Sequence, residues 1–159
     1  TKPCLVLLHG LCEDSTIWDA FIETLVADYF VLRPDLSGFG ASDILPQHSI
    51  DLMAESVKAV IDAEKIKSCV LVGHSLGGYV SVAFAKKYAS ILRGVGLFHS
   101  HPYEDTDDRK NGRVKAIEFI RKNGHILYVK QLIPNLFADL FVSSNQFLIN
   151  ALILKATQL

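Results

Sequence analysis

Short apolar runs alternate with amphipathic stretches along the N-terminal part of the chain, and this alternation constrains the fold most. The apolar runs cover residues 4–8, 29–32, 69–72 and 94–98. Helical spacing of apolar residues follows at 17–26, after Ser49 and over 76–88. Strands that are apolar throughout, each followed by a helix, are typical of a parallel sheet with both faces covered. We therefore predict an α/β fold, a three-layer sandwich around a mostly parallel sheet.

The pattern changes after Tyr103. A polar, charged stretch at 104–110 leads into helical patterns with no clear strand, at 114–120, 126–133, 134–141 and 145–154, and Gly124 is expected to end the first of these. Residues 1–102 are thus predicted to form the sheet core and residues 103–159 a helical region resting on the strand ends. The stretch 104–110 is dense in charge and lies between two apolar regions, so we predict that it is an exposed hinge.

Composition limits the classes of partner. Lysine plus arginine number 16 against 17 aspartate plus glutamate. This near-neutral balance gives no electrostatic reason to expect binding to nucleic acid or to an anionic membrane. The three cysteines, Cys4, Cys12 and Cys69, are scattered and form no Cys-x-x-Cys pair, which argues against a disulfide framework or a zinc site. No apolar run approaches the length of a membrane span, and the residues from Thr1 lack a signal-peptide pattern. We expect a cytoplasmic protein.

Residues 73–77 read Gly-His-Ser-Leu-Gly, directly after an apolar run and at the start of a predicted helix. A tight strand-to-helix turn strains the backbone of Ser75, and glycine at 73 and 77 removes the clash with the neighbouring chain. The helix N-terminus directs its free amides and its positive dipole end towards the same point. The N–H group of Leu76 is therefore predicted to donate to an oxyanion.

A second donor is expected from the end of the run at residues 4–8. His9, Gly10 and Leu11 follow that run, and Gly10 lets the chain turn so that the Leu11 amide can face Ser75. Two backbone donors at a developing oxyanion are worth roughly several kcal/mol each.

Together these motifs resemble the α/β-hydrolase superfamily. The similar segments are His9-Gly10, the Asp-Leu-Ser-Gly-Phe-Gly-Ala-Ser loop at 35–42, the elbow at 73–78 and a helical cap at 103–159. The resemblance implies that Ser75 is the nucleophile and that Leu11 and Leu76 form the oxyanion hole. His9, Gly10, Gly73, His74 and Gly77 would support the two turns. A serine at the elbow separates the chain from dehalogenase and epoxide-hydrolase relatives, which carry aspartate there.

The chain departs from the family in its catalytic base. The family's acid and histidine follow later strands, in the order serine, acid, histidine. No strand is predicted after Phe98, so we expect both residues to lie outside this partial chain, and residues 1–159 alone to be inactive. His125 has the right chain order but falls in the helical region. His99 and His101 end the strand expected beside the serine strand, and we interpret them as pocket residues.

The sequence therefore predicts a serine hydrolase that acts on a small ester or related acyl compound with an apolar portion, through an acyl-enzyme on Ser75. Neither a metal nor an organic cofactor is implied. Alternatives are a cofactor-free acyltransferase, perhydrolase or carbon–carbon bond hydrolase, and a non-catalytic binding module of the same fold. Asp35 is expected to fix its loop by hydrogen bonding, and the oligomeric state stays open.

Overall fold

The structure is a computed structural model that describes residues 2–159. The chain divides into two compact units, Thr1–Pro102 and Tyr103–Leu159.

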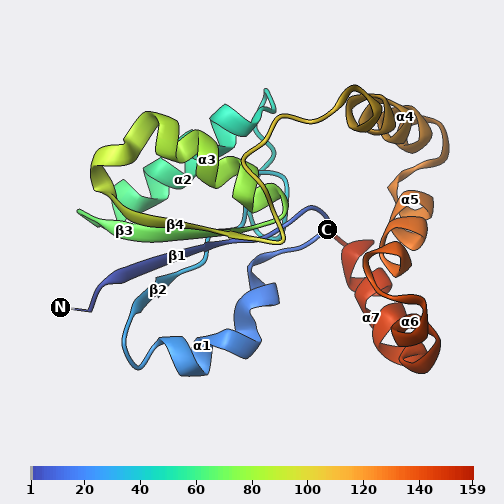
Figure 1. The fold of residues 1–159 in the computed structure, drawn as a ribbon, viewed down its shortest axis with the longest axis horizontal. Helices are drawn as coiled ribbons and strands as arrows, with labels where there is room; N and C mark the ends of the chain where they lie inside the picture. Colours follow the sequence, from blue (N-terminus) through green and yellow to red (C-terminus); the bar gives the residue numbers. More distant parts are fainter. Residues whose placement is uncertain (1) are drawn as a thin grey trace. The chain divides into compact units, whose positions relative to one another are not determined.

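The first unit is built on a four-stranded sheet (Figure 1). Its strands are β1 (Cys4–Leu8), β2 (Phe30–Leu32), β3 (Cys69–His74) and β4 (Leu92–Phe98), in the spatial order β2-β1-β3-β4. Every neighbouring pair is parallel, and β1 pairs with β3 from Cys4 opposite Cys69 to Leu8 opposite Gly73. The predicted α/β fold with a parallel sheet is confirmed.

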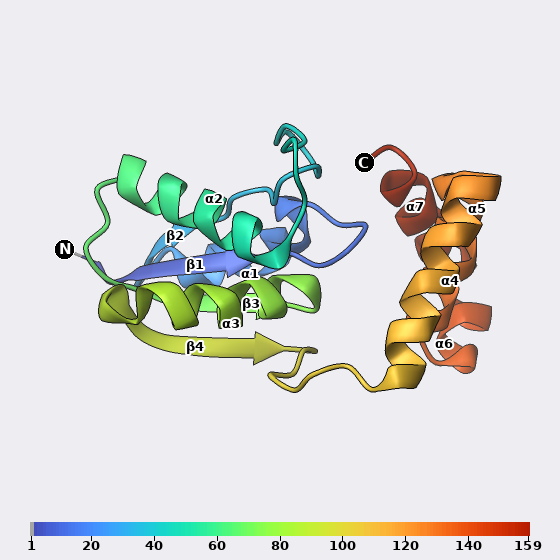
Figure 2. The same cartoon turned by 90° about the horizontal axis from the view of Figure 1, so that it is seen from above.

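Helices cover both faces of this sheet. Helices α2 (Ile50–Ala63) and α3 (Leu76–Tyr88) lie side by side on one face, and α1 (Asp19–Leu25) lies on the other (Figures 1 and 2). Side chains of β1 alternate between the two layers, as the pleat of a strand requires. Cys4, Val6 and Leu8 pack with residues of α2 and α3, while Leu5 and Leu7 pack with Trp18. This alternation explains why β1 reads as apolar throughout.

Two helix starts follow the expected capping chemistry. The Ser49 side chain accepts a hydrogen bond from Leu52 N–H at the start of α2, and Asp14 accepts one from Thr16 N–H. The helix predicted over 17–26 is instead a 3-10 turn, η1 (Ser15–Trp18), followed by the shorter α1. The buried Trp18 lies at the junction of the two.

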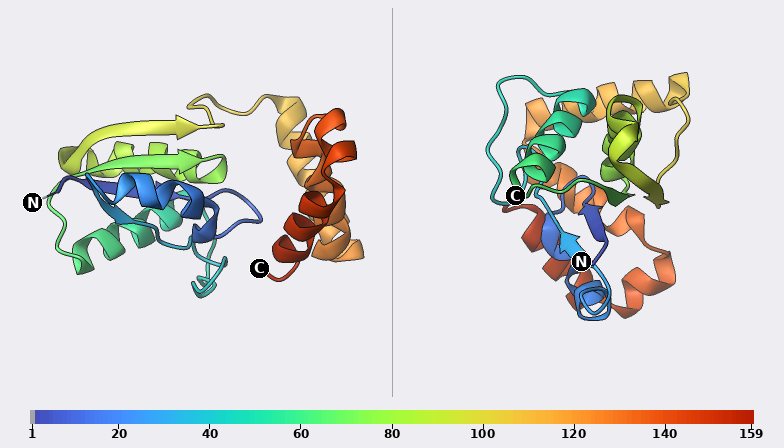
Figure 3. Two further views of the ribbon diagram at one scale, coloured as in Figure 1. Left: turned by 90° about the horizontal axis from the view of Figure 1, so that it is seen from below. Right: turned by 90° about the vertical axis from the view of Figure 1, so that its left-hand side faces the viewer.

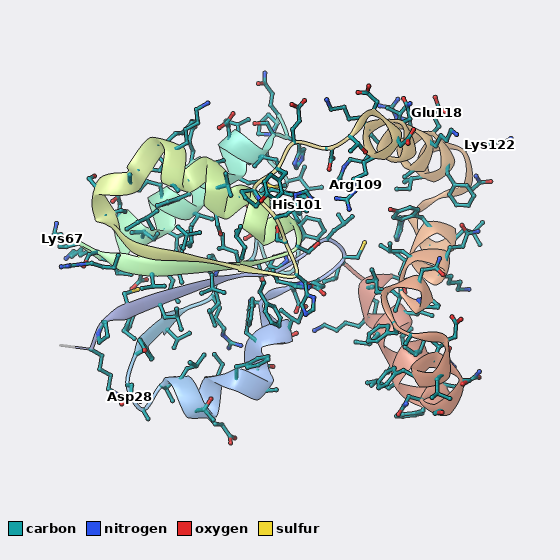
Figure 4. The ribbon with its side chains drawn as sticks, in the orientation of Figure 1. Asp28, Lys67, His101, Arg109, Glu118 and Lys122 are labelled. Carbon is teal, nitrogen blue, oxygen red and sulfur yellow. The ribbon has the colours of Figure 1, made fainter. Side chains whose placement is uncertain are left out.

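All four strand arrows point the same way, so their carboxyl ends share one edge of the sheet (Figure 3). Lys67 precedes β3 at the amino ends, whereas His101 follows β4 at the opposite edge (Figure 4). His9, Ser75 and His99 also follow the carboxyl ends of their strands. In open parallel sheets this edge is where ligands bind.

The second unit is helical. Its elements are α4 (Asp107–Asn123), α5 (His125–Leu132), the 3-10 helix η3 (Pro134–Leu136), α6 (Asp139–Ser144) and α7 (Gln146–Ala156). Val129, Ile133, Ile149 and Ala156 form its buried centre. Gly124 ends α4 with a φ of 82°, as predicted from the sequence.

Two expectations for this unit are corrected. The helical pattern over 134–141 is broken at Phe137 and Ala138, whose backbones are extended, so η3 and α6 are separate elements. The charged stretch 104–110 is not a hinge throughout, because Thr106 caps α4 and Asp107 begins it. Asp107 and Asp108 lie in the first turn of α4, where their negative charges interact favourably with the positive end of the helix dipole. The charged residues here therefore belong to the start of a helix.

None of the helices in the described part of the chain is both long enough and apolar enough to cross a membrane.

Candidate active site

Ser75 has an uncommon backbone conformation, with φ 48° and ψ −110°, immediately before α3. Residues other than glycine rarely take such values, which cost roughly 1–3 kcal/mol and cluster at functional sites. The Ser75 N–H donates to the Phe98 carbonyl oxygen at 3.0 Å and so extends the pairing of β3 with β4 beyond the strand end. Within the described residues, the Ser75 side chain makes no capping hydrogen bond to α3.

Glycines around the elbow leave no room for side chains. A Cβ atom on Gly73 would lie 2.1 Å from the Gly77 carbonyl oxygen. A Cβ atom on Gly77 would lie 2.6 Å from the Leu8 oxygen and 2.7 Å from the His9 oxygen. The backbone of the first turn of α3 therefore lies directly against the backbone at the end of β1. As a result, the turn that carries Leu11 and the turn that carries Leu76 are close together.

His9 is fully buried and is fixed in one tautomer. Its Nε2 accepts a hydrogen bond from Leu36 N–H at 2.8 Å, and its Nδ1 lies 2.8 Å from the Gly10 carbonyl oxygen. A carbonyl only accepts, so the ring proton is on Nδ1 and the imidazole is neutral. Burial lowers the pKa of His9 below its ordinary value, although hydrogen bonding to Gly10 and nearby carboxylates oppose this.

This hydrogen bond orients the peptide group between Gly10 and Leu11. In a trans peptide the C=O and N–H groups point in opposite directions. Because His9 holds the Gly10 carbonyl, the Leu11 N–H is directed away from the buried ring. Both His9 nitrogens are engaged in holding backbone, so His9 is not available as a base for Ser75.

Ser100 orients the peptide group between Ser75 and Leu76, as His9 orients the one between Gly10 and Leu11. Its hydroxyl donates to the Ser75 carbonyl oxygen at 2.9 Å, and Gly78 N–H donates to the same oxygen at 3.0 Å. A Cβ atom on Gly78 would lie 2.2 Å from the Ser100 Oγ, so only glycine leaves space for this approach. The Leu76 N–H, one of the free amides at the start of α3, points the opposite way.

His74 lies against the turn after β1. Its Nδ1 is 2.8 Å from Glu13 Oε2, which also accepts a hydrogen bond from Gly10 N–H at 2.7 Å. The His74 ring packs at 5.7 Å from Phe98 and 6.1 Å from His99 between ring centroids. The sequence did not predict a carboxylate partner for His74.

Three further histidines lie in different surroundings. His99 has a φ of 47°, and its ring lies 4.6 Å from that of Phe98. The His101 Nε2 lies 3.4 Å from the hydroxyl of Tyr79, on the first turn of α3. In the second unit, the His125 Nε2 lies 3.3 Å from the Thr157 carbonyl oxygen. Among residues 2–159, no three His, Cys, Asp or Glu side chains gather as a metal site would require.

Asp35 fixes its loop, as predicted. Its carboxylate accepts hydrogen bonds from Ser15 N–H at 2.7 Å and from Ala41 N–H at 2.9 Å, and its carbonyl accepts one from the Ser42 hydroxyl at 2.7 Å. Burial raises the pKa of Asp35, but the hydrogen bonds from Ala41 and Ser15 outweigh this and hold it below its ordinary value. Both carboxylate oxygens are occupied by backbone amides.

The buried, neutral state of His9 predicts a pH dependence of stability. The unfolded histidine gains a proton as the pH falls below about 6.5, while folded His9 resists protonation until its lower pKa is reached. The contribution of His9 to stability is therefore complete above about pH 6.5, the ordinary pKa of the unfolded histidine, and is lost as the pH falls from there to the lower pKa of the folded state. Between about pH 7.5 and about pH 5, the temperature of thermal unfolding should fall less in His9→Asn than in the wild type. Parallel pH profiles would contradict this.

Two residues of the site were missed by sequence reasoning, Glu13 and Ser100. Each acts through a hydrogen bond to a segment far along the chain, 61 residues away for Glu13 and His74 and 25 for Ser100 and Ser75. The one available signal was their position, since both lie within a few residues of a strand's carboxyl end.

Comparison with known proteins agrees with the fold. The family model described as alpha/beta hydrolase fold matches residues 3–141. A thermophilic esterase from Thermogutta terrifontis superposes with a TM-score of 0.88 at 30% identity, covering 99% of this chain and 58% of the esterase. The enol-lactonase from Burkholderia xenovorans gives a TM-score of 0.87 at 22% identity, covering 99% of this chain and 60% of the lactonase, a likeness of fold.

A curated sequence relative matches this chain over part of its length. Pyrrolizixenacetamide deacetylase of Xenorhabdus hominickii is 39% identical over 97 residues, which are 60% of this chain and 36% of the deacetylase. The chain thus spans little more than a third of that relative and over half of the esterase. Since the family model covers most of its length, the chain belongs to the α/β-hydrolase fold family.

Proposed function

We propose that this chain carries the nucleophile and the oxyanion hole of a serine hydrolase that acts on an ester or related acyl compound with an apolar portion. The observation that carries the proposal is the strained backbone of Ser75 at the start of α3, beside the turn after β1. Holding a non-glycine residue at φ 48° has a cost, and exposing a nucleophile is a physical reason to bear it.

The mechanism follows from the two oriented peptide groups. Ser75 Oγ attacks the carbonyl carbon of the substrate as a base takes its proton. The oxygen that becomes negative accepts hydrogen bonds from Leu11 N–H and Leu76 N–H, and this stabilisation is strongest in the transition state. The leaving group takes up the proton and departs, and water then hydrolyses the acyl-enzyme by the same route.

The base and its acid are proposed to lie outside residues 1–159, so that these residues alone have activity near background. This is supported by the 58% of the esterase that the chain spans. It is also supported by His9, which uses both ring nitrogens to hold backbone groups and so has none left to take a proton from Ser75. His99 and His101 are proposed as pocket residues.

The apolar portion of the substrate is proposed to meet residues 103–159, acting as a cap. Support comes from the large apolar side chains that this unit exposes, including Leu136, Leu140, Phe147 and Leu154.

The protein is proposed to act in a reducing compartment such as the cytoplasm, which is supported by the scattered thiols of Cys4, Cys12 and Cys69.

The serine at the elbow favours acyl chemistry over epoxide opening, although proteins named for both chemistries resemble this chain. The matched structures include an esterase and a lactonase. A mouse protein named epoxide hydrolase 4 is 31% identical over 106 residues, 64% of this chain and 29% of that protein. The elbow of this chain holds a hydroxyl rather than a carboxylate. Because an alcohol or peroxide can also attack an acyl-enzyme, a cofactor-free acyltransferase or perhydrolase is the alternative to a hydrolase.

Labelling with a fluorophosphonate probe tests the proposal in the natural full-length protein. Ser75 should be the modified residue, because the proposed oxyanion amides of Leu11 and Leu76 would stabilise the phosphonylated adduct, and mass spectrometry of the labelled peptide identifies it. Ser75→Ala is the matched control and should prevent labelling. Modification of another serine with Ser75 untouched would remove the enzyme interpretation.

A further inference from the structure

We propose that Glu13 is a positioning residue of the oxyanion hole, which fixes the turn after β1 against the elbow. This inference rests on the proposed function. A single oxygen, Glu13 Oε2, accepts the hydrogen bond from Gly10 N–H at 2.7 Å and lies 2.8 Å from His74 Nδ1. As an ionised carboxylate Glu13 only accepts, so His74 donates through Nδ1.

The contact is sheltered from solvent. The side chains of His74 and Glu13 are 18% and 22% exposed, so water screens their interaction less than it would on an open surface. Hydrogen bonds to a charged acceptor are about twice as strong as those between neutral groups. Cys12 adopts a φ of 60°, a left-handed conformation that is disfavoured outside glycine, and this turn brings Glu13 back over Gly10.

Glu13 and His9 hold Gly10 from its two sides. Glu13 binds the N–H of Gly10, and the His9 Nδ1 binds its carbonyl oxygen. A Cβ atom on Gly10 would lie 2.6 Å from Glu13 Oε2 and 2.8 Å from His74 Nδ1, so the three groups are closely packed. Two consecutive peptide groups are thereby fixed, and the second of them carries the Leu11 N–H.

The same carboxylate reaches the other half of the hole through His74, the residue before Ser75. The turn after β1 and the elbow thus touch in two places, at the backbone of Gly77 and at the Glu13 carboxylate. Removing the carboxylate leaves the backbone contact, so the fold should persist while the Leu11 amide loses its fixed orientation. An oxyanion develops only during the reaction, so this loss should lower kcat more than it changes KM.

Kinetics of Glu13 variants in the full-length protein test the proposal with a p-nitrophenyl ester. Glu13→Ala should lower kcat by about 10- to 100-fold and change KM by less than about threefold, as expected for a misplaced oxyanion donor. Glu13→Gln keeps an oxygen acceptor at the same reach and should stay within about fivefold of the wild type. Glu13→Asp keeps the charge but withdraws it by one methylene, and should be impaired like alanine.

The control is Glu55→Ala, which removes a glutamate that pairs with Lys87 across α2 and α3 at 2.7 Å, away from the elbow, and should leave kcat unchanged. A kcat for Glu13→Ala within about twofold of the wild type would overturn the inference. So would a fully active aspartate variant with an inactive glutamine variant, because charge and not geometry would then matter. Should Ser75→Ala retain the activity of the wild type, the proposed function itself fails, and the inference fails with it.

Discussion

Replacing Ser75 by alanine is expected to lower ester hydrolysis by the full-length protein by at least on the order of 10³-fold. In the proposed mechanism the hydroxyl oxygen of Ser75 forms the acyl-enzyme, and water would not occupy the same position with the same orientation. The remaining activity would come from the oxyanion amides of Leu11 and Leu76 and from substrate binding. Steady-state rates on one ester, with folding checked by circular dichroism, measure the effect.

Replacing Ser75 by glycine is expected to increase the stability of the protein, although activity is lost. Glycine populates positive φ without steric cost, so this variant should relieve strain at φ 48° and have a free energy of unfolding higher than that of Ser75→Ala by about 1 kcal/mol or more. Alanine keeps the Cβ atom and therefore the strain, which makes it the matched control. Equal stability of the two variants would mean that the elbow stores no strain, and activity in both would exclude Ser75 as nucleophile.

Gly73→Ala is expected to destabilise the protein by about 3 kcal/mol or more, or to prevent folding. The new Cβ atom would lie 2.1 Å from the Gly77 oxygen and 2.2 Å from the Gly77 carbonyl carbon. These are backbone atoms at the start of α3 and cannot rotate away as a side chain would. Chemical denaturation of the full-length variant measures the loss of unfolding free energy.

Gly94→Ala is the matched control for that substitution. It lies in β4, the strand paired with β3, and its Cβ atom would meet only Val70 methyl groups, at 3.9 and 4.0 Å. Ordinary contact distances predict a change within about 1 kcal/mol, since alanine also restricts the unfolded chain. A Gly73 variant as stable as the Gly94 variant would show that the elbow can open without loss of the fold.

The elements that sequence predicted well are those specified by local pattern. Helix α3 begins at Leu76 and ends at Tyr88 as its spacing predicted, and α2 follows Ser49 as predicted. The break at Phe137 and Ala138 was missed because apolar spacing continues across it, although the backbone there is extended. The stretch 104–110 was predicted as one exposed hinge, whereas α4 begins within it at Asp107, because aspartates at a helix start and in an exposed loop look alike in sequence.

For the candidate site, the sequence by itself determined the turn chemistry. Glycines at 73 and 77 around a serine, after a strand and before a helix, specify an elbow because only glycine fits backbone contacts this close. The tertiary structure alone decided how the donor peptides are held, through His9, Ser100 and Glu13. Periodicity describes neighbours along the chain, whereas these hydrogen bonds join strand ends that only the sheet order β2-β1-β3-β4 brings together.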